Sequence, residues 1–280
     1  MSQKKKVLKA LPWILIGFST SYLCLMLTLS YLIDFLHVDM FGLRSFINNY
    51  SNPYFWMFVF IEGSITEHIQ WAFLIIVLVI VVLHILKTYR KFTNRDALPW
   101  FLFFIGVYLM FLEDRSNIRH LISQTIGSRL LGQDIYGAAW ETSMIRSSIE
   151  LFFYFIVSCT MLSAFVLIIK KYKNLQQGTL FLLTGYLLYG FAAFASATRN
   201  IGNWYAVVGT KVLDLIIAGR DIGWTASTIP TFSWKPLGFW FMDFVVEESI
   251  ELMAVTFLLA AVLIFLPLTK NNEEMSEQLA

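Results

Sequence analysis

The sequence predicts an all-α integral membrane protein, a six-helix transmembrane bundle formed as a single membrane domain over residues 1–280. Hydrophobic residues make up 58% of the chain, charged residues only 14%, and the mean hydropathy is +0.66. A soluble domain carries about 25% charged residues, so much of this surface must face lipid. The net charge of +2 is small and no basic, aromatic-rich stretch accompanies it. The expected partner is therefore the lipid bilayer and not a nucleic acid.

Six apolar stretches predict the spans, because a helix needs about 20 apolar residues to cross the hydrocarbon core. The stretches without an internal charge are Leu11–Ile33, Ile69–Leu86, Ala97–Leu112, Leu151–Ile169, Thr179–Thr198 and Leu252–Thr269. We expect the shorter ones to extend into their polar flanks. The first follows a lysine cluster, as in a signal peptide, but it is too long and no small-residue cleavage site follows it. It is therefore expected to remain as the first span.

The positions of Lys and Arg predict the orientation. Segments 4–9, 87–95 and 170–173, together with position 270, hold 12 of the 21 basic residues. These segments are short and lie on one side of the predicted membrane. The sequence thus predicts a protein of the cytoplasmic (inner or plasma) membrane with both termini in the cytoplasm, where residues 271–280 form a tail.

Short motifs recur in the same order along the chain. Ala-Leu-Pro-Trp opens spans one and three at residues 10–13 and 97–100, and Ser-Ile-Glu-Leu opens spans four and six at residues 148–151 and 249–252. His-Ile-Gln-Trp at residues 68–71 is a looser counterpart in span two. The motifs predict three related helical hairpins, as internal repeats are interpreted. Chance matches within apolar sequence are the alternative.

The predicted repeat units are residues 10–91, 97–173 and 179–270. An apolar segment with helical spacing lies in each of the three outer loops, at Leu36–Tyr50, Ile118–Leu131 and Tyr205–Ala218. Such segments are typical of amphipathic helices that lie in the membrane interface. We therefore expect three amphipathic interfacial helices on the outer face of the bundle.

Carboxylates gather at one level of the predicted membrane. Glu67, Glu150 and Glu251 precede the first basic residue after their helices by 20, 20 and 19 residues. At 1.5 Å per residue this is about 30 Å, the thickness of the hydrocarbon core. Glu113 and Asp114 end span three at the same level. The sequence therefore predicts an ionisable layer at the outer membrane boundary.

The densest part of this layer precedes span six. Asp243, Glu247 and Glu251 follow the spacing i, i+4, i+8, and Glu248 lies beside them. Like charges at this spacing repel, and contact with lipid would raise the cost, so this face is expected to look into the protein. The arginines expected at the same level are Arg115, Arg119, Arg146 and Arg199.

Arg146 holds the repeat position next to those of Glu67 and Glu248, so we expect it to face those two acids of the other hairpins. If the layer handles a small ion or solute, as in a transporter or channel-like protein, two sets of residues would bind it. The acids are Glu67, Glu113, Asp114, Glu150, Glu247, Glu248 and Glu251, and the balancing cations are Arg115, Arg146 and Arg199.

Two other functions fit the same layer. A membrane-embedded metal-dependent enzyme would use Glu67, His68, His120, Glu247 and Glu251 as ligands of a divalent metal. No zinc or di-iron motif is present, so no cofactor is supported by a motif. A structural or complex-assembly protein would use the same groups as buried ion pairs that tie the hairpins together. The sequence makes no prediction about the oligomeric state.

Overall fold

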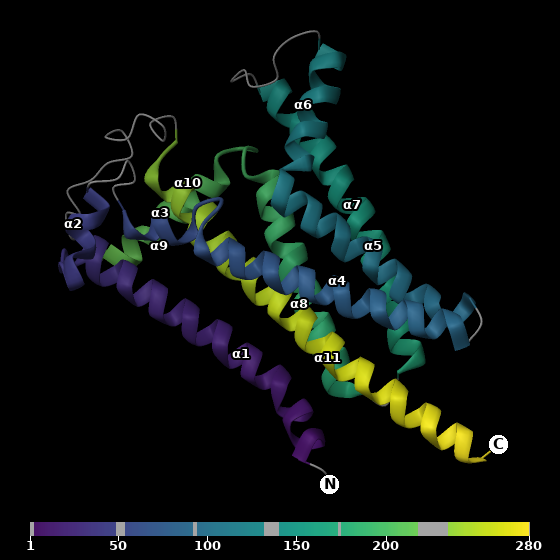
Figure 1. Ribbon diagram of the computed structural model, residues 1–280. Coiled ribbons are helices and arrows are strands. Elements are labelled where there is room, and N and C mark those ends of the chain that lie inside the picture. The colour runs from purple at the N-terminus through teal and green to yellow at the C-terminus, as the bar shows by residue number, and fades with distance from the viewer. Residues whose placement is uncertain are drawn as a thin grey trace.

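The computed structural model describes residues 3–48, 54–91, 94–131, 140–172, 175–217 and 235–279. Throughout these ranges the chain folds only into helices and short connections (Figure 1). Six segments are long and apolar enough to cross a membrane, which confirms the prediction of an all-helical membrane protein. They are Ala10–Phe35, Phe55–Thr88, Ala97–Ser116, Met144–Lys171, Gln176–Thr198 and Leu237–Phe265.

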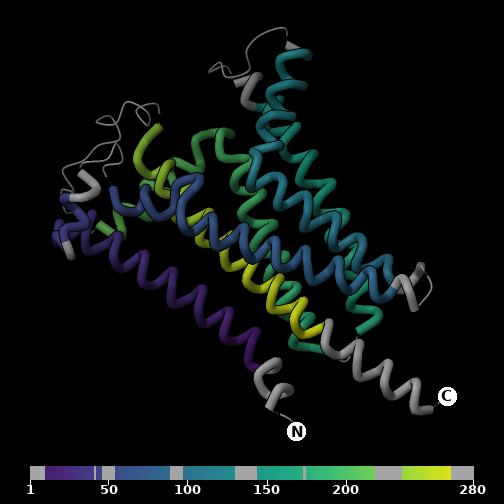
Figure 2. The backbone as a smooth tube through the Cα atoms, in the orientation of Figure 1, coloured from purple at the N-terminus to yellow at the C-terminus, as the bar shows by residue number. Residues whose placement is uncertain are grey.

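Long helices form the bundle, and shorter ones join them. The helices are α1 (Gln3–Ser30), α2 (Leu43–Asn48), α3 (Phe55–Phe60), α4 (Ile65–Lys91), α5 (Asn94–Ser116), α6 (Ile118–Leu131), α7 (Trp140–Lys171), α8 (Gln176–Thr198), α9 (Trp204–Ile217), α10 (Leu237–Trp240) and α11 (Glu248–Leu279). Two π-helical segments, Tyr31–Phe35 and Phe241–Glu247, continue α1 and precede α11. The coloured parts of α1 and α11 run in opposite directions through the bundle (Figure 2).

Two spans begin more than ten residues earlier than the sequence predicts. The second starts at Phe55 with α3, breaks after Phe60 and resumes in α4. The sixth starts at Leu237, 15 residues before the predicted Leu252. The prediction excluded every charge from a span, whereas here Glu67 lies inside α4, and Asp243, Glu247, Glu248 and Glu251 lie inside the helical segments of span six.

Helix α11 is the central element of the bundle. It packs against α1, α4 and α8, and 67% of its most apolar stretch is buried. Gly185 of α8 allows the closest approach, since a Cβ atom there would lie 2.8 Å from the carbonyl oxygen of Ala254. Small residues at contacts of this kind let membrane helices approach closely. The polar face of α11 is therefore held in a fixed position between its neighbours.

Asp34 connects the first span to the short helix α3. It is buried, and its two carboxylate oxygens accept hydrogen bonds from the backbone N–H groups of Phe55 and Trp56, at 2.8 and 3.0 Å. The first N–H groups of a helix have no partner within the helix, and an acidic side chain satisfies them. Asp34 thus anchors the start of span two from a distant part of the sequence.

The connecting segments are helical to different extents. Helices α6 and α9 coincide within a residue with the segments predicted at Ile118–Leu131 and Tyr205–Ala218. Between residues 36 and 48, however, the α-helix covers only Leu43–Asn48, because Asp39 accepts hydrogen bonds from Arg44 and Ser45 and starts the helix late. The rest of the predicted segment, residues 49 and 50, lies outside the described residues.

Candidate functional site

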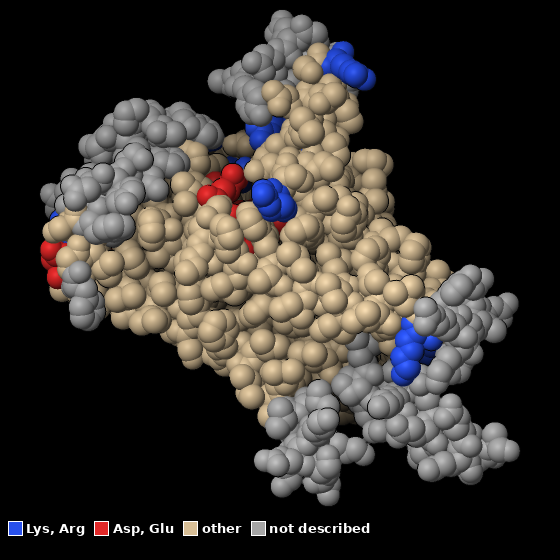
Figure 3. Space-filling model, viewed as in Figure 1, with Lys and Arg blue, Asp and Glu red and all other residues tan. Residues whose placement is uncertain are grey.

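An acidic cavity lies at the end of the bundle opposite the start of α1. It has a volume of about 40 Å³, which is enough for more than one water molecule. We call it the acidic cavity and define it by its lining residues, Glu62, Glu67, Glu113, Asp114, Asn117, Arg119, Arg199, Asp243, Phe244, Glu247, Glu248 and Glu251. Figure 3 shows acidic atoms reaching the surface near the start of α4, with basic atoms close by. Eight carboxyl groups thus surround one small space with two guanidinium groups.

The π-helical segment and the first turns of α11 together supply half of these acids. Asp243 and Glu247 belong to the π-helical segment, and Glu248 and Glu251 to the first turns of α11. A π-helical turn inserts an extra residue into the helix and is frequent at functional sites. The predicted convergence of the four acids on one interior face is therefore present, with Glu248 and Glu251 at 8% and 7% exposure.

Arg119 of α6 is the main buried cation. Its Nη1 lies 3.3 Å from Glu113 Oε1 and donates a hydrogen bond to Ser196 Oγ at 2.9 Å, and it also contacts the hydroxyl of Tyr154. Burial by itself lowers the pKa of this guanidinium, but Tyr154, Glu113 and Glu150 raise it by more. Arg119 thus stays charged and neutralises Glu113 at the wall of the acidic cavity.

Arg199 follows α8 and pairs with Asp243. Burial lowers the pKa of Arg199, but the negative charges of Asp243 and Glu247 raise it by more. The pKa of Arg199 is therefore above the ordinary arginine value. Glu247 accepts a hydrogen bond from the hydroxyl of Tyr205 at 2.7 Å. Burial and the neighbouring Glu247 raise the pKa of that hydroxyl, which therefore remains a neutral donor.

Three further acids, Asp114, Glu248 and Glu251, have no arginine partner among the ion pairs of the described residues and few hydrogen-bond donors. One amide nitrogen, Gln70 Nε2, donates to both Asp114 Oδ2 and Glu251 Oε2, each at 3.0 Å. The two carboxyl groups are therefore close neighbours with a neutral donor between them. Glu248 is buried, and its Oε2 atom has no hydrogen-bond partner among the described residues. Two carboxylates that share a site cannot both stay ionised without a proton or cation.

Glu150 does not join the acidic cavity, although the sequence predicts it at the same level. Its Oε1 atom lies 2.9 Å from Arg146 Nε and 3.0 Å from His120 Nδ1, and accepts a hydrogen bond from Ser123 at 3.2 Å. Arg119 Nε is 3.7 Å from its other oxygen. Glu150 thus lies in a separate network between α6 and α7, which Arg119 joins to the cavity.

His120 lies at the centre of that network. Its Nε2 atom is 3.1 Å from Arg119 Nη2 and 3.2 Å from Arg199 Nη2, both of which are obligatory donors, so Nε2 acts as the acceptor. Its Nδ1 atom lies 3.0 Å from Glu150 Oε1, which is an acceptor, and 2.9 Å from Arg146 Nη2, which is a donor, so both ring nitrogens face guanidinium groups. Burial lowers the pKa of His120, and the charges of Arg119 and Arg199 lower it as well, against the opposing effect of Glu150.

Several predicted site residues lie elsewhere. Arg146 pairs with Glu150 one turn along its own helix, and the expectation that it faces Glu67 and Glu248 is wrong, because this acid on the same helix is nearer. Arg115 is exposed, and its guanidinium lies 4.7 Å above the ring of Trp71. Glu67 does line the cavity and accepts a hydrogen bond from the backbone N–H of Gly63.

The two histidines of the metal hypothesis have other neighbours. His68 is exposed, and its Nδ1 atom lies 2.6 Å from the carbonyl oxygen of Ser64. His120 belongs to the network around Glu150. Within the described ranges no three His, Cys, Asp or Glu side chains stand close enough together to hold a metal ion. Metal binding stays a prediction.

The predicted binding set lacked some residues that line the cavity and one that donates to its acids. Glu62 follows α3 in the break of span two, and nothing in the sequence distinguishes it from a loop residue. Gln70 could have been identified from the sequence, because it holds the motif position that Glu150 and Glu251 occupy in the other predicted hairpins. A glutamine in place of an acid at this position supplies the donor that two neighbouring acids require.

No protein-family model matches the sequence, and no curated protein or solved structure is significantly similar to it. The geometry of the acidic cavity therefore carries the functional argument alone.

Proposed function

We propose that the protein binds a small cation in the acidic cavity and moves it across the membrane, as a transporter or channel-like protein. One observation carries the proposal: eight carboxyl groups and two guanidinium groups surround a single small cavity. If all were ionised, the site would hold a large excess of negative charge, and every acid except the exposed Glu62 is at least partly shielded from water, so the cost would be high. Protons or cations must supply the balance, and a site that needs mobile positive charge is suited to handling it.

The unpartnered oxygen of Glu248 supports binding over a purely structural role. In a scaffold of ion pairs, each buried acid would have its own cation or donor. Arg119 and Arg199 pair with Glu113 and Asp243, while Glu248, which lines the cavity, has one buried oxygen without a hydrogen bond from the described chain. Glu248 is accordingly the residue that a bound cation would contact.

The proposal includes the finer architecture that the sequence predicts. Three related hairpins carry α6 and α9 as interfacial helices after the third and fifth spans, and the acidic cavity lies at the outer membrane boundary. In support, each of these helices directly follows a span, and the basic segments of the sequence all fall at the opposite ends of the spans. Both termini are then cytoplasmic.

The test compares cation flux into liposomes that contain the purified protein. An enclosed pH-sensitive dye reports protons, and radioactive sodium and rubidium report metal cations. Glu248→Gln removes the charge from the acid with the unpartnered oxygen and keeps the shape of the side chain. We expect it to lower the flux at least about tenfold, equivalent to about 1.4 kcal/mol in cation binding.

Asp214→Asn is the matched control, because Asp214 is an exposed acid of α9 outside the acidic cavity. It should leave the flux unchanged. The thermal stability of Glu248→Gln in detergent separates binding from scaffolding. Relief of repulsion between buried acids should leave this variant at least as stable as the parent. If it is clearly less stable and the flux of the folded fraction is normal, the acids are structural and the proposal is wrong.

A further inference from the structure

The cation species can be inferred from a second cavity that adjoins the first. Glu113 lines the acidic cavity, and its carboxylate accepts two hydrogen bonds from the opposite direction. The hydroxyl of Tyr154 donates to Oε1 at 3.0 Å, and that of Tyr189 donates to Oε2 at 3.3 Å. Both tyrosine side chains are buried. Glu113 is therefore bonded to hydroxyl groups that lead away from the acidic cavity into the bundle.

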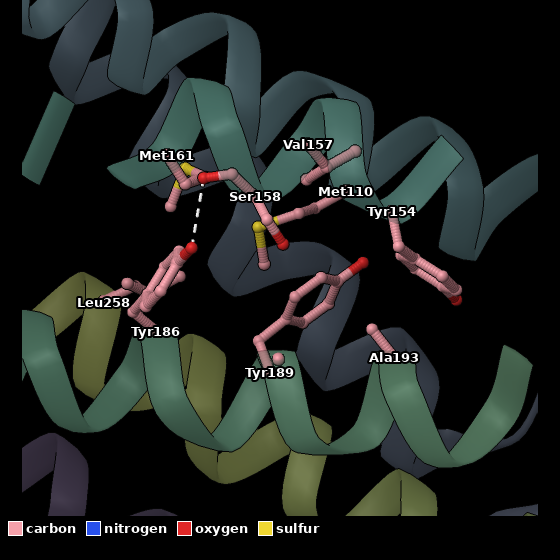
Figure 4. Close-up of a pocket in the computed structure, with 10 residues that line it drawn as sticks. Met110, Tyr154, Val157, Ser158, Met161, Tyr186, Tyr189, Ala193 and Leu258 are labelled. Carbon is pink, nitrogen blue, oxygen red and sulfur yellow. Dashed lines mark hydrogen bonds between the residues drawn. The ribbon is translucent and has the colours of Figure 1, made fainter. Parts of the chain in front are cut away.

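The same two tyrosines line the second cavity, which we call the hydroxyl cavity. Its volume is about 10 Å³, and its residues are Met110, Tyr154, Val157, Ser158, Met161, Tyr186, Tyr189, Gly190, Ala193 and Leu258. Figure 4 shows Tyr186 and Tyr189 projecting from α8 toward α7, where Tyr186 donates a hydrogen bond to the carbonyl oxygen of Ser158 at 3.0 Å. The hydroxyl groups of Tyr154 and Tyr189 thus stand between the two cavities.

The size and lining of the hydroxyl cavity select among cations. A volume of about 10 Å³ is at the lower limit for one water molecule. A metal cation would have to leave its water behind and enter a space lined mostly by methionine, valine, alanine and leucine side chains, which costs several kcal/mol. A proton needs no such space, because it moves along hydrogen bonds.

We infer that the cation is the proton, and that it passes from the acidic cavity through Glu113 and Tyr189 into the hydroxyl cavity. This inference rests on the proposed function. Glu113 binds a proton from the acidic cavity, and the hydroxyl of Tyr189 turns its own proton from Glu113 toward a water molecule that the hydroxyl cavity can hold. Glu113 then gives its proton to the tyrosine oxygen as the original hydroxyl proton passes to that water. One O–H bond forms as another breaks at each oxygen, so tyrosine and carboxylate return to their starting states.

Tyr186 is the next hydroxyl along α8, one turn from Tyr189 toward the start of that helix. It lies at the far end of the hydroxyl cavity and is half-buried. Its hydroxyl group can accept a proton from water in the hydroxyl cavity while it passes its own proton to water beyond, and the carbonyl of Ser158 only orients this hydroxyl by accepting its hydrogen bond. The route therefore continues away from the acidic cavity toward the predicted cytoplasmic side.

The experiment uses the same liposomes and three tyrosine variants. Tyr189→Phe and Tyr186→Phe each remove one hydroxyl group and keep the ring, and Tyr108→Phe makes the same change at an exposed tyrosine of α5 outside both cavities. Proton uptake is driven by a potassium diffusion potential and followed with the enclosed dye. We expect Tyr189→Phe to reduce it at least about tenfold, a modest share of what a positioned proton donor contributes. Tyr186→Phe should reduce it as well, and Tyr108→Phe should not.

The outcomes distinguish the two proposals. If the parent protein moves protons, Glu248→Gln abolishes the flux and Tyr189→Phe retains it, the route is wrong and the acidic cavity still functions. If the parent moves sodium or rubidium but no protons, the cation assignment is wrong. If Glu248→Gln leaves every flux of the parent unchanged, or the parent moves no cation, both proposals fail. The melting temperatures of the tyrosine variants in detergent, measured in parallel, identify any loss of folded protein, and Tyr186→Phe tests the route without touching Glu113.

Discussion

Replacing Arg119 gives the sharpest test of how the acidic cavity is built. Arg119→Leu keeps an apolar stem on α6 but removes the cation that lies 3.3 Å from Glu113. Both side chains are almost fully buried, at 5% and 6% exposure. The replacement leaves Glu113 as a buried carboxylate without its cation and leaves Ser196 without its donor. Breaking a buried ion pair in this way costs about 3–5 kcal/mol.

Two further variants test whether this loss of stability comes from the unpaired charge or from the packing of the arginine side chain. Arg119→Lys keeps the charge but cannot reach Glu113, Ser196 and His120 at once, so it should lose about 1–2 kcal/mol. The double variant Arg119→Leu/Glu113→Gln removes the stranded charge and should recover at least about 1 kcal/mol relative to Arg119→Leu. A recovery shows that the cost lay in the unpaired acid and not in the packing of the arginine stem.

The assay is equilibrium unfolding in mixed detergent micelles, followed by tryptophan fluorescence. The chain has nine tryptophans, several of them buried in the bundle, so the signal reports the global transition. If Arg119→Leu unfolds within about 1 kcal/mol of the parent protein, Arg119 does not neutralise Glu113, and the charge balance described above is incorrect.

Three other changes test the fold around the site. Gly209→Ala on α9 would place a Cβ atom 1.9 Å from a carbonyl oxygen of α10, so the melting temperature should fall, with a loss of about 1–3 kcal/mol in free energy of unfolding. At Gly190 an added Cβ atom meets nothing within 4 Å, so Gly190→Ala should raise the free energy of unfolding by about 0.5–1 kcal/mol. Asp34→Ala removes the cap of α3 and should cost about 1–2 kcal/mol in free energy of unfolding, and an equal loss for Asp214→Ala, at an exposed acid of α9, would contradict this role. The folded-state pKa of His120 lies below the ordinary value of about 6.5, so the unfolded chain binds the proton first and stability falls as the pH drops below about 6.5. His120→Gln should flatten that part of the stability profile between pH 5 and 7, measured by thermal unfolding.

The sequence predicts the spans well because the bilayer imposes a length and an apolar composition on each helix. It predicts the start of span six poorly for a related reason. Asp243 and Glu247 count against membrane burial in any rule based on composition, yet Arg199 and Tyr205 satisfy them inside the protein. Those partners come from residues more than 40 positions away, and no local pattern indicates them.

For the site, the sequence predicts the level of the acids in the membrane but not the partners of each acid. The level of the acids follows from helix length, so Glu67, Glu113, Asp114, Glu247, Glu248 and Glu251 were correctly expected to come together. Their pairing depends on the directions in which neighbouring helices present their side chains, and the sequence does not specify these. Glu150 faces α6 and pairs with Arg146, so Arg146 does not reach the acidic cavity. Arg119 is the buried cation that pairs with Glu113 there.

The π-helical segment Phe241–Glu247 limits insertions and deletions directly before α11. Asp243 pairs with Arg199 from within this turn, which is wider by one residue than the hydrogen-bonded turn of a regular α-helix. Deletion of one residue would let the segment close to α-geometry, so the side chains of the turn itself would project in other directions. Val245 can thus be exchanged for another apolar residue during evolution, but a single-codon deletion beside it would rotate one wall of the acidic cavity out of place.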